Sequence, residues 1–162
     1  MKTITKAIMY LQMTALCLTA ALAGPRAANK GVPFRGSLEA VETHEVDFPM
    51  LLATGSGTGN ATHLGRFTMD FVAHVDLLSQ IGIGTAHFIT ANGDSLFTDV
   101  IGQGNPTGDP DVVRVVELYT ITGGTGRFAD ATGSFTIERV ADLVTGFSDG
   151  SFDGTIVFGK AK

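Results

Sequence analysis

The chain has 162 residues and a formal net charge of −5, with 21 glycines, 11 phenylalanines and no tryptophan. This composition favours short strands and turns over long helices. The few Lys and Arg residues are scattered along an acidic chain, which argues against nucleic acid as a partner and against binding to an anionic membrane surface.

Residues 1–23 have the pattern of a secretory signal peptide. Lys2 and Lys6 form a basic start, residues 8–22 are mostly apolar, and small residues flank Leu22 in the way that signal peptidase requires. We therefore expect cleavage after Ala23 and a secreted or periplasmic protein. No second long apolar run follows, so no membrane insertion is expected once the signal has been removed.

The only cysteine, Cys17, lies within this expected signal peptide. The remaining chain would therefore contain neither a disulfide nor a thiolate metal site. An exported protein of this kind depends on packing and backbone hydrogen bonds for its stability. Residues 24–33 are expected to be a flexible N-terminal lead, and residues 34–160 a single domain.

Residues 66–77 give the clearest strand signal. Apolar and polar side chains alternate there with a period of two, which is typical of a strand with one buried face. The apolar set is Phe67, Met69, Phe71, Ala73 and Val75.

Further candidate strands follow the same principle along the chain. Asn92-Gly93 is a strong hairpin-turn signal between two of them. Residues 37–47 would also suit a helix but are interpreted as a strand. The candidate segments cover residues 34–40, 85–91, 95–101, 112–122, 135–138 and 155–158. About eight strands at short, even spacing, without intervening helical patterns, predict an all-β, closed antiparallel barrel.

The segment 119–135 reads Tyr-Thr-Ile-Thr-Gly-Gly-Thr-Gly-Arg-Phe-Ala-Asp-Ala-Thr-Gly-Ser-Phe. Its glycines are expected to permit positive φ in a tight connection at Gly123, Gly124 and Gly126. Gly133 would let the following strand bend or bulge. Phe128 is expected to fold back as a plug over the barrel end.

This segment resembles the hallmark of the allene oxide cyclase and dirigent barrels, in which a strand ends in Gly-Gly-Thr/Ser-Gly-x-Phe. A looser likeness to bacterial members lies in residues 59–67. The resemblance implies an eight-stranded antiparallel barrel of the calycin type, a lumen that holds a small apolar molecule, and a possible homotrimer. Some members cyclise a fatty-acid epoxide and others steer the coupling of phenoxy radicals, in both cases without a bound cofactor. The functional lumenal residues of these families lie outside the matching segment, so none is transferred to this chain.

Glycine-rich and acidic segments elsewhere suggest turns rather than cofactor sites. Residues 55–59 (Gly-Ser-Gly-Thr-Gly) lack both the following lysine of a phosphate-binding loop and the helix of a dinucleotide fold, so a flexible turn or bulge is expected there. Residues 109–111 and 149–154 resemble fragments of calcium loops but lack the length and terminal glutamate, and turns are expected. No cofactor is therefore expected.

The four histidines give no metal-binding spacing. Neither HxH nor HExxH occurs, and a catalytic zinc ion usually needs three protein ligands. Surface or hydrogen-bonded histidine is the preferred interpretation of His44, His63, His74 and His87. No metal site is expected.

Two residues of the segment 113–121 are candidates for catalysis. Glu117 shares a strand face with Tyr119 and with the apolar Val113, Val115 and Ile121. If this face lines the lumen, Glu117 is a buried carboxylate next to a phenol, an arrangement suited to acid–base chemistry. The alternative is that Glu117 lies at the rim or in solvent. Arg139 has the same parity as Phe135 and Ile137 and is a possible partner for Glu117.

A second group of residues is expected to line a ligand-binding lumen. The group shares inward parity on two predicted strands: Phe67, Met69, Phe71, Phe135, Ile137 and Arg139. The aromatic residues, with Phe88 and Phe158 as further candidates, either line a pocket or simply fill a small barrel.

Three functions remain open at this stage. The first is an exported barrel that binds a small apolar molecule in its lumen. The second is a cofactor-free cyclase, isomerase or dirigent-like enzyme that uses Glu117 and Tyr119. The third is a non-catalytic structural or interaction barrel, alone or as a trimer, which would expose an apolar strand face.

Overall fold

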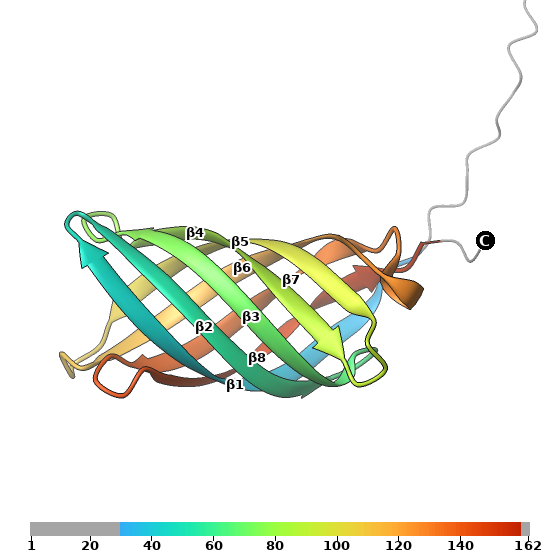
Figure 1. The fold of residues 1–162 in the computed structure, drawn as a ribbon, viewed down its shortest axis with the longest axis horizontal. Helices are drawn as coiled ribbons and strands as arrows, with labels where there is room; N and C mark the ends of the chain where they lie inside the picture. Colours follow the sequence, from blue (N-terminus) through green and yellow to red (C-terminus); the bar gives the residue numbers. More distant parts are fainter. Residues whose placement is uncertain (1–29, 160–162) are drawn as a thin grey trace, which may run out of the picture.

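The computed structural model describes residues 30–159, which form a closed barrel of eight antiparallel strands (Figure 1). Each strand pairs with the next one along the chain, and β1 closes the barrel against β8. The strands are β1 (Val32–Asp47), β2 (Met50–Ala61), β3 (Gly65–Asp76), β4 (Ile81–Thr90), β5 (Ser95–Pro106), β6 (Val112–Gly124), β7 (Thr132–Asp142) and β8 (Phe147–Val157). The predicted all-β, eight-stranded antiparallel barrel is confirmed.

The expected signal peptide, residues 1–23, lies outside the described residues, as do residues 24–29 of the expected lead. The prediction of a flexible lead up to residue 33 is wrong for its last two residues, because β1 begins at Val32 and pairs there with Ile156 of β8. Residues 37–47, for which a helix was an alternative, are strand throughout.

In β3, the side chains that alternate with a period of two point alternately into the barrel lumen and towards solvent. Phe67 and Met69 are almost completely buried in the lumen, whereas Thr68 and Asp70 on the opposite face are exposed. The same alternation runs through all eight strands, as the burial patterns of β1 and β7 illustrate. A curled sheet with one apolar face therefore encloses its own core.

The expected turn at residues 55–59 is wrong, because these residues lie inside β2. Gly55 and Gly59 are paired with Phe71 and Phe67 of β3, and a Cβ at either glycine would collide with the ring of its partner. The glycines are thus required by close aromatic packing within the sheet rather than by a change of chain direction.

Residues 149–154, interpreted as a turn, also lie inside a strand, β8. A Cβ at Gly150 or Gly154 would collide with a backbone oxygen of β7. These glycines therefore serve close strand contact in the sheet and not a hairpin.

The connection after β6 agrees largely with its sequence pattern. Gly123, Gly126 and Gly133 have positive φ angles of 138°, 53° and 131°, and the register of β5 against β6 shifts beside Phe97 and Thr98. The expectation for Gly124 is wrong, since it lacks a positive φ; its missing side chain leaves room for the Ser95 carbonyl oxygen and Phe128.

Phe128 belongs to a short 3-10 helix, η1 (Gly126–Phe128), and is fully buried. Its ring lies 5.9 Å from that of Phe158. This helix lies at the barrel end drawn on the right of Figure 1. We call this end the plugged end; it carries the connections 62–64, 91–94 and 125–131.

Aromatic side chains pack tightly in the lumen. The ring of Phe135 lies 5.0 Å from the rings of Phe34, Tyr119 and Phe152, and Phe88 adds a further edge-on contact at 5.9 Å. Such ring pairs add to the stability that burial itself provides.

The opposite end of the barrel, on the left of Figure 1, carries the connections 48–49, 77–80, 107–111 and 143–146. We call it the mouth end. None of the elements in residues 30–159 is a helix of sufficient length and hydropathy to cross a membrane.

Candidate functional site

A cavity of about 180 Å³ occupies the lumen towards the mouth end. Its walls are mainly apolar, and it reaches the turns of that end at Leu77, Gln80 and Leu143. The remaining lining residues are Glu42, His44, Leu51, Ala53, Phe71, Ala73, Val75, Gly82, Val100, Gly102, Gly104, Val113, Val115, Glu117 and Arg139.

Small residues at inward positions create this cavity. Gly82 on β4 and Gly102 and Gly104 on β5 leave their inward positions without a side chain, and Ala53 and Ala73 fill theirs only in part. Further along the same barrel many inward positions carry phenylalanine, and these rings pack against one another in the core. The sequence thus packs one half of the lumen solidly and leaves the other half hollow.

Two glutamates and an arginine form an ion-pair cluster in the wall of the cavity. Arg139 donates from Nε to Glu117 Oε2 at 3.0 Å, from Nη2 to Glu117 Oε1 at 3.3 Å and from Nη1 to Glu42 Oε1 at 2.9 Å. The side chains are 11% exposed for Arg139, 9% for Glu117 and 3% for Glu42. We call these three residues the Glu–Arg–Glu cluster.

Burial by itself lowers the pKa of Arg139, but the charges and hydrogen bonds of Glu117 and Glu42 outweigh this effect and raise it above its ordinary value. The guanidinium therefore stays charged. Its plane also lies over the ring of Phe71, with Cζ 5.6 Å from the ring centre, a cation–π contact.

Tyr119 lies next to the cluster in the core. Its hydroxyl donates to Glu117 Oε2 at 3.5 Å, a long hydrogen bond, and its ring stacks on Phe135. Burial, together with the negative charge of Glu117, raises the pKa of Tyr119 well above its ordinary value. The phenol therefore keeps its proton and acts as a hydrogen-bond donor to the cluster.

The structure brings together the two residues predicted for catalysis and the predicted partner. Glu117 and Arg139 line the cavity and Tyr119 contacts Glu117 from the packed core, so the rim or solvent alternative for Glu117 is wrong.

The six predicted lining residues divide into two groups. Phe71 and Arg139 line the lumen cavity. The other four belong to the packed core and do not line it: Phe67, Met69, Phe135 and Ile137. Of the two alternatives for the aromatic residues, pocket lining therefore applies to Phe71, and filling of the barrel applies to Phe67 and Phe135.

Sequence reasoning missed Glu42 and His44, which both line the cavity from β1. His44 Nε2 lies 3.9 Å from Glu42 Oε1. The sequence pattern does predict both positions. Phe34 and Leu38 point inwards, and continuing the same period of two along the strand places Glu42 and His44 on the inward face.

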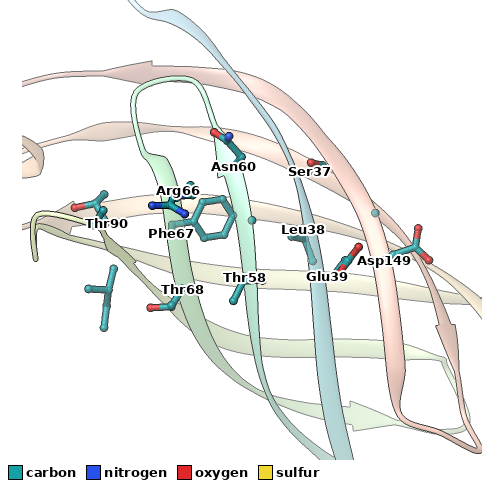
Figure 2. Close-up of a pocket in the computed structure, with 14 residues that line it drawn as sticks. Ser37, Leu38, Glu39, Thr58, Asn60, Arg66, Phe67, Thr68, Thr90 and Asp149 are labelled. Atoms are coloured by element: carbon teal, nitrogen blue, oxygen red, sulfur yellow. The ribbon is translucent and has the colours of Figure 1, made fainter.

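A larger depression of about 740 Å³ lies on the outer surface of β8, β1, β2, β3 and β4. Figure 2 shows Asn60 on β2, Thr68 on β3 and Asp149 on β8 lying apart rather than converging on a point. Because it is open to solvent, it lacks the enclosed walls of a small-molecule site. The lumen cavity is therefore the candidate site.

Within residues 30–159, no three His, Cys, Asp or Glu residues lie together in an arrangement that could hold a metal ion. Comparison of the chain with protein-family models, with curated proteins and with solved structures finds no match.

Proposed function

We propose that this protein is an exported barrel that binds a small, mainly apolar molecule in its lumen cavity. The observation that carries the proposal is an apolar cavity of about 180 Å³ with a buried Glu–Arg–Glu cluster in its wall, inside an otherwise close-packed core. Apolar walls with a few placed polar groups are typical of small-molecule sites. Export is proposed from the signal-like pattern of residues 1–23.

The size of the cavity restricts the ligand. A cavity of about 150 Å³ accommodates a molecule as large as benzene, and most ligand pockets measure about 300 Å³ or more. The proposed ligand is therefore a compact molecule built around one ring or a short branched chain. A long-chain lipid would not fit within the cavity.

Binding can be tested by the thermal shift that a ligand produces when it binds only the folded chain. Ethylbenzene is a suitable probe, and we expect a saturable increase in the melting temperature of the full chain. Gly104→Val would project methyl groups into the cavity and abolish the shift. Gly108→Val is the matched control, because a Cβ at Gly108 contacts nothing within 4 Å. Absence of a saturable shift with ethylbenzene and similar one-ring probes would refute lumen binding.

A second candidate is a cofactor-free isomerase or cyclase. It is favoured by the contact of a buried carboxylate, Glu117, with a phenol, Tyr119, beside an apolar cavity. Such a pair can move a proton at a bound molecule. Glu117→Gln keeps the shape of the side chain and should abolish any turnover found with small epoxides or enols. Unchanged turnover would exclude Glu117 as the acid or base.

A third candidate is self-association, as in a homotrimer. Ile83, Ile101 and Leu118 are register neighbours on β4, β5 and β6, and their side chains are exposed on the outer surface. Exposed apolar patches of this kind are typical of interfaces. Sedimentation of the chain and of Ile101→Glu would test this role. A monomer at all concentrations would count against it.

A further inference from the structure

The cavity wall contains more negative than positive charge. Glu42 and Glu117 are both buried, and among residues 30–159 the guanidinium beside them is that of Arg139. The imidazole of His44 also lines the cavity, with Nε2 3.9 Å from Glu42 Oε1. With both carboxylates ionised, the cluster has one excess negative charge. Water cannot screen this charge well in an apolar surrounding, so its effect on a bound molecule is larger than it would be at the surface.

Arg139 is poorly placed to attract an anionic ligand. Each of its three guanidinium nitrogens already donates to a carboxylate oxygen of Glu117 or Glu42. A carboxylate or phosphate ligand near Arg139 would also lie near two other negative groups. Repulsion of this kind is a common way in which a site rejects the wrong ligand.

One acceptor in the cluster is unused. Glu117 receives hydrogen bonds at both carboxylate oxygens, but in the part of the chain that the structure describes no group donates to Glu42 Oε2. Glu42 lines the cavity, and its side chain is only 3% exposed. Among residues 30–159, Ser148 Oγ is the only completely buried side-chain N or O atom without a hydrogen-bond partner, so Glu42 Oε2 is not sealed off. A donor on a molecule in the cavity can therefore reach this oxygen and form a charge-assisted hydrogen bond.

The aromatic wall agrees with the same ligand chemistry. The Phe71 ring lines the cavity and already has a cationic neighbour in Arg139. Because Arg139 already supplies the cation over this ring, Phe71 offers the apolar body of a ligand a surface to pack against, while the carboxylate attracts its ammonium group.

We propose that the lumen cavity selects a compact apolar amine, whose ammonium group donates to Glu42 Oε2 while its apolar body fills the space between Phe71 and the mouth end. This inference rests on the proposed lumen binding and specifies its ligand class. No covalent step is involved.

The test compares probes that share one body and differ in the head group. 2-Phenylethylamine, 2-phenylethanol and phenylacetate are titrated into the full chain by calorimetry at pH 8. Ethylbenzene serves as the probe without a head group. Because a charged hydrogen bond contributes about 1.5–3 kcal/mol, we expect the amine to bind about ten-fold or more tightly than the alcohol, and phenylacetate to bind most weakly.

Glu42→Gln removes the excess charge while keeping the shape of the side chain. It should reduce the affinity for the amine about ten-fold and leave that for the alcohol nearly unchanged. Glu39→Gln is the matched control, because Glu39 lies on the same strand, faces outwards and does not line the cavity. If Glu42→Gln does not fold, the comparison of the four probes on the unmodified chain decides alone.

The outcomes separate the two proposals. If the alcohol or phenylacetate binds as tightly as the amine, or if Glu42→Gln weakens amine and alcohol equally, the amine inference is overturned and lumen binding stands. If none of the four probes binds, lumen binding itself is overturned, and the amine inference with it.

Discussion

Arg139 donates two hydrogen bonds to Glu117, from Nε to Oε2 at 3.0 Å and from Nη2 to Oε1 at 3.3 Å. The two residues lie on adjacent strands and are diagonal neighbours, since Glu117 is paired with Ile137 and Arg139 with Val115. Side chains of this length meet readily across such a diagonal. The bidentate contact fixes the carboxylate in the cavity wall, and the third guanidinium nitrogen fixes Glu42.

Replacing the arginine should be costly. Arg139→Met would leave two buried carboxylates without their counter-charge, and we expect a loss of about 3–5 kcal/mol in the free energy of unfolding, measured by urea denaturation. Arg114→Met is the control, because the ion pair of Arg114 with Glu138 is more than half exposed and should contribute at most about 1 kcal/mol. Similar losses in both variants would show that the cluster is not a buried ion-pair network.

The raised pKa of Tyr119 predicts a dependence of stability on alkaline pH. In the unfolded chain the phenol ionises near pH 10, whereas in the folded barrel burial and Glu117 hold it protonated. Its contribution to stability is therefore complete below about pH 10 and is lost as the pH rises through the folded pKa.

The absorbance of tyrosinate measures the ionisation of Tyr119 directly in a Tyr10→Phe variant, where Tyr119 is the only tyrosine of the chain. We expect tyrosinate to form together with unfolding, as followed by circular dichroism. Tyr119→Phe should reduce the alkaline loss of stability. Ionisation of a still-folded barrel near pH 10 would contradict this prediction.

Asp142 should contribute to the loss of stability in acid. Its Oδ1 accepts from the backbone N–H groups of Thr145 and Val144 at 2.9 Å each, and these hydrogen bonds hold its pKa below the ordinary value. The contribution is therefore present above the unfolded pKa of about 3.9 and is lost as the pH falls through the lower folded pKa.

Asp142→Asn should flatten the dependence of the melting temperature on pH in this acidic range. Asp70→Asn, on the exposed outer face of β3, is the control and should leave the dependence as it is in the unmodified chain. If both variants behave alike, the turn hydrogen bonds of Asp142 are not the cause.

Phe135 should be among the most sensitive positions of the packed half. It is 1% exposed and contacts four other aromatic rings, so Phe135→Ala would leave a large internal void. We expect a loss of about 3–5 kcal/mol in the free energy of unfolding.

Phe97→Ala provides the matched comparison, because the Phe97 side chain faces outwards and is 41% exposed. Its cost should be about 0.5 kcal/mol, as for most surface substitutions. An equally small loss for Phe135→Ala would mean that the core can collapse around the missing ring.

Several local features of the fold were predictable from sequence. The alternation of residues 66–77 gives the inward face of β3, and Asn92-Gly93 gives the β4–β5 turn, where Gly93 has a φ of 87°. Both are properties of neighbouring residues, since side chains alternate along a strand and a tight turn needs a positive φ. The turns predicted from the glycines of residues 55–59 and 149–154 were wrong. Both segments lie inside strands, where glycine permits close contact between neighbouring strands.

By itself, the amino-acid sequence determined that this chain forms strands with one apolar face, that Glu117 shares a strand face with Tyr119, and that Arg139 shares one with Phe135. It left open whether the face of Glu117 points into the lumen. Only the tertiary structure decided that Glu42 joins them and that the aromatic rings fill one half of the lumen while glycines leave the other half hollow. The physical reason is that alternation is set within each strand, whereas contacts across the lumen depend on the register and closure of all eight strands.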